Sequence, residues 1–331
     1  VVIPVRTIGN GVELPSNFAS IPQYPLQTKK RIKFLHISSA FPRKGVDILL
    51  RAYFSAFTDA DDVCLVLKTF PNPHNQVRTL LKQLRGQYSH GPEVEWIDCD
   101  LPEGKLYGLY KAVDCYVHSA RGEGFGLPVA EAMLARLPVI VSPNTGMADF
   151  CNEDTAALVP YTMEPAQSHL TEGAAYWARP DEDILRQRMQ EFYQDPASQL
   201  VQKRIENAYQ LISTRFTWAA AAKRWTEFID GVQAHQVRPK VAMVTTWNNK
   251  CGIAEYTRFQ CEAMRNMADF TIYPNYGVEL LRPDEGYVQW RSWHSAFSGD
   301  MDDLCQALLK GNEEIVHFQF NFGFFKLDNL A

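Results

Sequence analysis

The feature that most constrains this chain is a regular alternation of short apolar segments and longer amphipathic segments, which begins at residue 31. Short, mainly apolar runs at 33–38 and 63–68 are typical of strands that are buried on both faces. Segments with apolar residues at helical spacing, such as 44–58 and 74–88, separate such runs. This alternation predicts an α/β domain with a doubly wound parallel sheet of the Rossmann-like type. Ligands of such sheets bind beyond the carboxyl ends of the strands.

The same alternation predicts two units. Residues 1–30 contain Pro, Gly, Asn and Ser at short intervals without a period, which indicates a linker or a domain edge. We expect the first α/β domain over 31–232, a linker over 233–239, and a second, partial Rossmann-like α/β unit over 240–331. The first and last residues of the sequence read as cuts through a longer chain.

Composition excludes several classes of protein. The net charge of −5 provides no basic field for nucleic acid. The seven cysteines form no C-x-x-C pair and have no zinc-type spacing with histidine, so we expect reduced thiols in a cytoplasmic protein. No apolar run approaches the ~18 residues that a membrane-spanning helix requires.

The most informative loop lies between a strand and a helix, at 119–126. Its glycines at 122, 124 and 126 allow close approach of a ligand to the backbone. The helix that follows from Leu127 presents free N–H groups and the positive end of its dipole. Together these features favour a phosphate or another anion.

Two acids, Glu123 and Glu131, flank this anion site. Glu123 lies in the loop, and Glu131 lies about one turn into the helix. Ionised carboxylates accept strong hydrogen bonds from hydroxyl groups, which sugars supply. The alternative is an ordinary strand–loop–helix corner in which the two acids occur by coincidence.

The sequence EGFGLPVAE at 123–131, followed by AM, resembles the signature of the family-4 retaining glycosyltransferases of the GT-B fold. By this resemblance, Glu131 binds the ribose hydroxyls of a nucleotide. The donor sugar and the diphosphate are then held by Glu123 and by the loop and helix start, namely Gly124, Phe125, Gly126 and Leu127.

Residues 41–50 (FPRKGVDILL) resemble the first strand–loop–helix turn of the same family, in which a lysine contacts the donor diphosphate. Lys44 takes that place, and a cation there stabilises charge on the leaving nucleotide. Where many members have an arginine, this chain has Ser38, so Arg43 or Lys68 is expected to supply the charge. A solvated lysine at a helix start is the alternative for Lys44.

A second loop, at 142–149, occupies the place of a small-residue loop of the family, with Thr145 and Gly146 beside the donor. A plain turn is an equally good interpretation. The sequence contains three D-x-D pairs, which are a possible metal-binding pattern, and Asp98–Asp100 is the best placed of them. Two carboxylates alone, however, bind a metal ion poorly. We expect no metal and no cofactor beyond the nucleotide sugar.

The second unit resembles the start of the family's acceptor-side domain. Gly252 lies in the loop before its first helix, and His317 lies on a later strand. Either residue is a candidate for the acceptor cleft, although His317 also fits a histidine packed against the sheet. Because acceptor-side domains normally precede donor domains, this order predicts a fragment of a tandem enzyme.

The resemblance implies a hexosyltransferase that moves a sugar from a UDP- or GDP-linked donor to a glycan or lipid-linked glycan, with retention. Synthesis of a bacterial surface polysaccharide such as lipopolysaccharide, at the inner face of the plasma membrane through peripheral association, is the expected setting. Two alternatives remain: a module that binds nucleotide sugars without catalysis, and an epimerase of UDP-GlcNAc. The oligomeric state is open.

Overall fold

The computed structural model describes residues 6–167, 175–231, 238–248, 251–276, 288–289, 291–293 and 301–319. Contacts divide the chain into two compact units, which we treat separately. The described part of the larger unit comprises residues 12–167 and 176–215. The smaller unit includes residues 6–11 and the described residues from Phe216 onward. Of the expected linker at 233–239, residues 233–237 lie outside the described residues.

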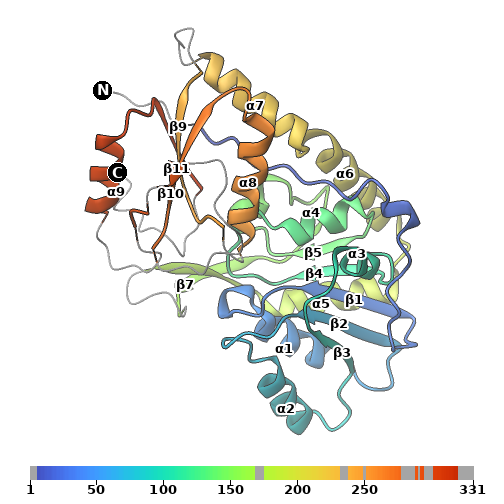
Figure 1. Cartoon of the computed structure of the whole chain (residues 1–331). Coiled ribbons are helices and arrows are strands. Elements are labelled where there is room, and N and C mark those ends of the chain that lie inside the picture. Colours follow the sequence, from blue (N-terminus) through green and yellow to red (C-terminus); the bar gives the residue numbers. More distant parts are fainter. Residues whose placement is uncertain are drawn as a thin grey trace. The chain divides into compact units, whose positions relative to one another are not determined.

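The larger unit is built on a six-stranded sheet in which all pairings are parallel (Figure 1). The strand order is β3-β2-β1-β4-β5-β6. The expected doubly wound sheet is thus confirmed. Its strands are β1 (Ile32–Ile37), β2 (Val63–Thr69), β3 (Glu93–Asp98), β4 (Cys115–His118), β5 (Val139–Val141) and β6 (Ala157–Leu158).

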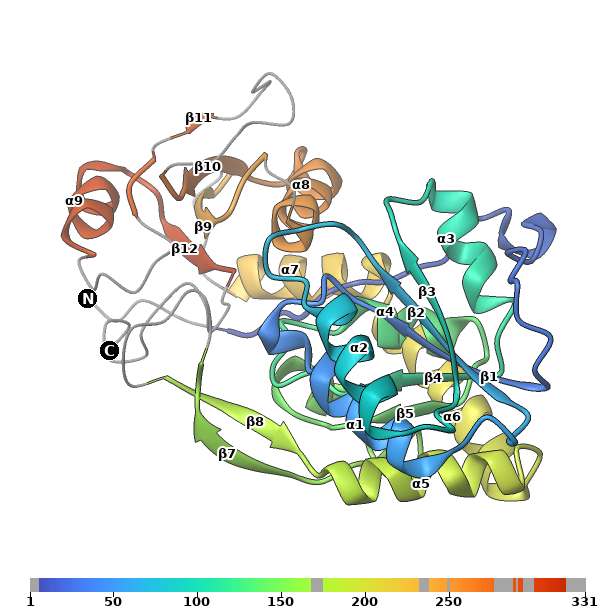
Figure 2. The ribbon, with the colours of Figure 1, turned by 90° about the horizontal axis from the view of Figure 1, so that it is seen from below.

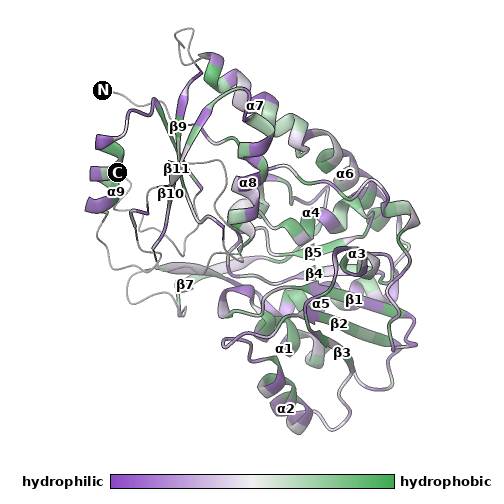
Figure 3. Cartoon of the chain, in the orientation of Figure 1, coloured by the Kyte–Doolittle hydropathy of each residue, from purple (hydrophilic) through white to green (hydrophobic). Residues whose placement is uncertain are grey.

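Helices cover both faces of this sheet (Figure 2). On one face, α1 packs against α2 and α5; on the other, α4 packs against α6. Figure 3 shows that the central strands are mainly apolar and that the helices are apolar only in part, so each helix can cover the sheet with its apolar side. The helices are α1 (Val46–Ala56), α2 (Val77–Gln87), α3 (Glu103–Tyr110), α4 (Leu127–Leu134), α5 (Glu182–Gln194) and α6 (Gln199–Arg215).

The strand order reverses between β1 and β4. From β1 the chain moves outward through β2 to β3, and it then returns to place β4 on the other side of β1. The loops that leave β1 and β4 therefore run to opposite faces of the sheet at its carboxyl edge. Ligands of doubly wound sheets bind at this kind of switch point.

A two-stranded antiparallel hairpin, β7 (Tyr161–Pro165) and β8 (Tyr176–Pro180), follows the sheet (Figure 2). The sequence pattern did not predict it, because apolar and polar residues are mixed in both strands and only Ala178 and Pro180 are buried. A short 3-10 helix at Phe18–Ser20 lies in the segment that was expected to be a linker. That segment, from Val12, belongs to the larger unit.

The smaller unit has a four-stranded sheet in the order β11-β10-β9-β12, with parallel pairings. The expected second α/β unit is therefore present. Its elements are α7 (Trp218–Gly231), β9 (Lys240–Thr245), α8 (Gly252–Met264), β10 (Asp269–Pro274), β11 (Val288–Gln289), α9 (Asp302–Lys310) and β12 (Ile315–Phe318).

Helix α7 lies on the other side of the unit boundary from where we expected it. Residues up to 232 were assigned to the first domain, but the contacts place the boundary before Phe216. The reason is packing: Trp225 and Ile229 of α7 are buried in one cluster with Val241 and Met243 of β9. The apolar pattern of an amphipathic helix does not indicate which of two sheets the helix covers.

None of the helices that the structure describes combines the length and the apolar character needed to cross a membrane.

Candidate nucleotide-sugar site

The loop after β1 is shaped by a glycine. A 3-10 turn at Pro42–Lys44 ends at Gly45, which has a φ of 65° and caps α1. A Cβ atom on Gly45 would lie 2.0 Å from the carbonyl oxygen of Ser119. Only glycine fits both the left-handed backbone and this close approach. The loop after β1 therefore packs directly on the loop after β4.

Hydrogen bonds join these two loops. The Ser119 hydroxyl donates to the Gly45 carbonyl oxygen at 2.8 Å, and the Arg121 amide donates to the Arg43 carbonyl oxygen at 2.8 Å. The Arg121 guanidinium also donates to both carboxylate oxygens of Asp47, at 2.7 and 2.8 Å. Such bidentate pairs fix geometry as well as energy. Two segments far apart in sequence are thus joined to each other at the carboxyl edge of the sheet.

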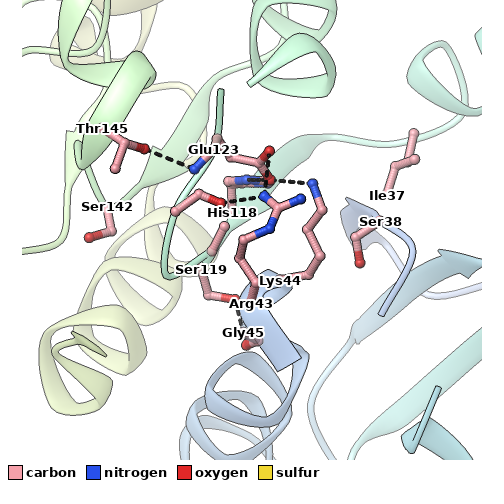
Figure 4. A network of polar contacts seen from close by, with 12 residues as sticks. Ile37, Ser38, Arg43, Lys44, Gly45, His118, Ser119, Glu123, Ser142 and Thr145 are labelled. Carbon is pink, nitrogen blue, oxygen red and sulfur yellow. Dashed lines mark hydrogen bonds and ion pairs between the residues drawn. The ribbon is translucent and has the colours of Figure 1, made fainter. Parts of the chain in front are cut away.

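Glu123 lies where these loops meet, and three side chains converge on it (Figure 4). Its Oε1 accepts from Lys44 Nζ at 2.6 Å and lies 3.2 Å from His118 Nε2. Its Oε2 accepts from Arg43 Nη1 at 3.3 Å. Glu123 and Lys44, which the sequence offered as separate ligands of sugar and diphosphate, are therefore in direct contact.

The charge of Glu123 follows from these neighbours. Burial alone would raise the pKa of Glu123, but Lys44, His118 and Arg43 together hold that pKa well below its usual range. An ionised, buried carboxylate is stable here because each of its oxygens is hydrogen bonded. Lys44 and Arg43 provide one positive charge more than Glu123 neutralises, and this excess suits an anionic ligand.

The loop after β5 supports Glu123 from the backbone. The Glu123 amide donates to the Thr145 hydroxyl at 2.8 Å, and the Gly146 amide donates to the Glu123 carbonyl oxygen at 3.3 Å. A Cβ atom on Gly146 would lie 2.0 Å from the Gly124 carbonyl oxygen. Thr145 and Gly146 thus lie beside the candidate donor loop, and the structure shows them as its support.

Helix α4 begins at Leu127, directly after the loop, with Pro128 in its first turn. Gly126 caps it with a φ of 90°, and the Phe125 ring is buried against Phe150 at 5.1 Å between centroids. The first amides of a helix have no acceptor within the helix. The start of α4 therefore adds partial positive charge next to Glu123.

Glu131 has surroundings unlike those of Glu123. The Tyr110 hydroxyl donates to its Oε2 at 2.7 Å. Burial raises the pKa of Glu131 to about 7, although hydrogen bonds from Tyr110 and Tyr107 oppose that shift. Its carboxylate retains acceptor positions that hydroxyl groups of a ligand can fill.

Two histidines underlie the site. The rings of His36 and His118 stack at 5.5 Å between centroids. His36 Nδ1 donates to the Val117 carbonyl oxygen at 2.8 Å, so its Nε2 accepts from the Ser38 hydroxyl at 3.0 Å. Burial, with help from His118, lowers the pKa of His36 to about 3 and keeps it neutral.

His118, His36 and Tyr110 were not among the site residues expected from the sequence. Both histidines stand at the carboxyl ends of apolar strands, where side chains reach the ligand side of the sheet. This shared position at the strand ends is the sequence feature that could have identified both histidines as site residues. For Tyr110 there was no such feature, because its contact with Glu131 depends on how α3 and α4 are placed.

A family comparison decides what kind of protein this is. The family model described as Glycosyl transferases group 1 matches residues 18–210, which is more than half of the chain. The chain belongs to that family. The matched range covers both loops around Glu123, together with Glu131. A comparison with curated proteins found no match.

Several solved structures resemble this chain in fold. The glycosyltransferase of Rickettsia africae has 15% identity and a TM-score of 0.53, with 69% of this chain and 57% of that one covered. HepE of Anabaena in complex with UDP has 18% identity and a TM-score of 0.51, with 66% and 54% covered. Sucrose-phosphate synthase of Thermosynechococcus elongatus has 21% identity and a TM-score of 0.49, with 68% and 50% covered. The chain thus spans about half the length of these proteins.

Two further residues at the carboxyl edge, Ser38 and Lys68, have partners of their own. Besides its contact with His36, the Ser38 hydroxyl accepts from the Ala40 amide at 3.2 Å. Lys68 is buried and donates to the Thr69 carbonyl oxygen at 2.8 Å. Arg43, one of the two cations proposed to replace the missing arginine, pairs with Glu123 at 3.3 Å.

The D-x-D pair at Asp98 has a structural explanation. Asp98 Oδ1 accepts from the Thr69 hydroxyl at 2.7 Å and from the Asn75 amide at 3.1 Å. Within the described ranges, no group of three or more His, Cys, Asp or Glu residues is placed to hold a metal ion.

The two acceptor-side candidates belong to the smaller unit. Gly252 is the first residue of α8. The His317 ring packs on Trp225 at 4.9 Å between centroids, and burial lowers the pKa of His317 to about 4. Packing against Trp225 matches the interpretation of His317 as a histidine held against its sheet. Its role in an acceptor cleft stays a prediction.

Proposed function

We propose that this chain binds a nucleotide-diphosphate sugar in the crevice beyond β1 and β4 and transfers the sugar to a glycan with retention. The observation on which the proposal rests is the convergence of Lys44, Arg43 and His118 on Glu123, next to the start of α4. The group 1 family and the UDP complex of the HepE structure support a nucleotide as the ligand.

In this proposal the diphosphate lies against Lys44, Arg43 and the first amides of α4. Charge that develops on the leaving phosphate is stabilised there, and this is the main catalytic contribution of the larger unit. Glu123 orients Lys44 and accepts hydroxyls of the donor sugar, and Glu131 accepts the ribose hydroxyls. Retention follows if the leaving phosphate deprotonates the acceptor on the same face of the sugar.

The proposed setting is the synthesis of a bacterial surface polysaccharide at the cytoplasmic face of the membrane. The order of the two units also supports a tandem enzyme, with the smaller unit as the start of an acceptor-side domain. Both proposals rest on the family resemblance and on the parallel sheet of the smaller unit.

The test is nucleotide release from a panel of UDP- and GDP-sugars, with and without glycan acceptors. We expect release with at least one donor, and we expect Lys44→Met to lower the rate by about 10²–10³-fold because it removes charge from the leaving group. Lys82→Met, which changes an exposed lysine of α2, is the matched control. Equal rates in both variants would disprove the role of Lys44.

One outcome favours the second candidate function. Because the chain spans about half the length of its structural relatives, it can retain donor binding without transfer. Binding of UDP or GDP together with no nucleotide release from any donor would identify a nucleotide-sugar binding module.

A further inference from the structure

A cavity lies in the larger unit, at the hairpin β7–β8. It has a volume of about 290 Å³, near the lower end of the ~300–1,000 Å³ range of small-molecule sites. This volume suits one small ring better than an extended chain. Its lining consists of Arg51, Arg121, Glu164, Pro165, Gln167, Trp177 and Arg179.

The lining has an excess of positive charge, with three guanidinium groups and one carboxylate. Asp47 pairs with Arg121 at 2.7 Å, and Glu182 pairs with Arg51 at 2.8 Å, but neither acid lines the cavity. Arg179 is more than half exposed and lies 3.6 Å from Glu164. The cavity therefore presents guanidinium groups whose counterions lie mostly outside it.

One of these groups has an unused donor. Arg121 is 9% exposed, and its Nε has no hydrogen-bond partner among the described residues. Oε1 of Glu164 lies 3.9 Å from this nitrogen, which is too far for a hydrogen bond. A buried donor on a charged group is costly without an acceptor, so a ligand oxygen at this place would be favoured.

The remaining lining provides what a sugar ring requires. Trp177 offers an aromatic surface, and the Arg121 guanidinium lies 5.0 Å from its ring centroid. The Trp177 indole donates to Glu164 Oε1 at 3.0 Å, which leaves the other oxygen of Glu164 near Arg179. A carboxylate and the amide of Gln167 suit hydroxyl groups, and an aromatic ring suits the apolar face of a sugar.

We propose that this cavity binds an anionic sugar residue, a pyranose with a carboxylate. The carboxylate pairs with Arg179 and with the free donor of Arg121, and the ring hydroxyls bind Glu164 and Gln167. The further assignment of this residue to the acceptor glycan rests on the proposed function, whereas the binding itself does not.

The test follows the indole N–H resonance of Trp177 by NMR, assigned with Trp177→Phe, while glucuronate is added to the full chain. We expect a saturable shift. Arg179→Gln should weaken the affinity about tenfold or more, because it removes a hydrogen bond to a charged group. The matched control is Arg186→Gln, which removes a partly exposed arginine of α5 that pairs with Asp183 outside the cavity and should leave the affinity unchanged.

Three other probes separate the alternatives. Glucose should bind about tenfold more weakly than glucuronate, because it lacks the charge. An equal affinity for inorganic phosphate would overturn the sugar assignment, since the cavity would then be a plain anion site. A saturable shift with UDP would also overturn it, because the cavity would belong to the nucleotide site. Absence of a shift with glucuronate would overturn it whether or not UDP binds elsewhere.

Discussion

At the scale of the residue, Glu123 does more than accept hydroxyl groups. It holds Lys44 and Arg43 in place before any ligand arrives. Holding cations in advance reduces the reorganisation that binding of a diphosphate would otherwise require. The types of residue at this site could be predicted from the sequence. Their mutual contacts could not, because they depend on how two loops about 80 residues apart pack together.

Gly45 gives a prediction at the same scale. We expect Gly45→Ala to destabilise the larger unit by about 2–4 kcal/mol, because it combines a left-handed φ with overlap against Ser119. Gly86→Ala is the control: Gly86 lies in α2, and a Cβ atom there would meet nothing within 4 Å. That change should be neutral or stabilise by up to about 1 kcal/mol. Hydrogen exchange of amides in β1 and β2 measures the stability of the larger unit in both variants. An equal change in stability for Gly45→Ala and Gly86→Ala would contradict this account of the loop.

Glu131 predicts a dependence of nucleotide binding on pH. Its pKa is raised to about 7, so the side chain is mostly protonated below that pH and mostly ionised above it. The ionised form is the better acceptor for ribose hydroxyls, so we expect affinity to rise as pH increases through 7. Calorimetry from pH 6 to 8 measures this. A nucleotide phosphate also titrates near pH 6, so Glu131→Gln is required as the control. The same pH profile in both proteins would show that Glu131 does not contribute.

At the scale of the element, the strands and helices of the larger unit could be predicted from the sequence. The apolar runs of its strands and the helical spacing of apolar residues in its helices are both clear. The hairpin β7–β8 was not, because its apolar residues Tyr161, Met163 and Tyr176 are exposed and give no pattern of burial. Helix α7 was predicted as a helix but assigned to the wrong unit. Its apolar stripe indicates that it covers a sheet, and only packing determines which sheet.

The placement of α7 can be tested. We expect Trp225→Ala to lower the stability of the smaller unit by about 3–5 kcal/mol, because the ring is 1% exposed in the cluster with β9. Hydrogen exchange should then show loss of protection in β9 and β10, with β1 and β2 unchanged. Phe54→Ala, in the core of the larger unit, should give the reverse pattern. Loss of protection in β1 and β2 after Trp225→Ala would contradict the observed boundary.

At the scale of the whole molecule, the site follows from topology. The reversal of strand order at β1 and β4 places two loops at one edge, and each loop brings part of the charge around Glu123. The alternation of strands and helices predicted such an edge, and the loop sequences showed which loops to examine. The smaller unit repeats the architecture, with parallel strands around β9.

The most direct test of the central claim is calorimetric titration of the full chain with UDP and with GDP. We predict saturable binding of at least one of them, and a loss of about tenfold to a hundredfold in affinity for Glu131→Ala, because a hydrogen bond to a charged group is removed. Glu206→Ala, which removes an exposed carboxylate of α6, should leave the affinity unchanged. No binding of either nucleotide, or an unchanged affinity in Glu131→Ala, would contradict the assignment of this site.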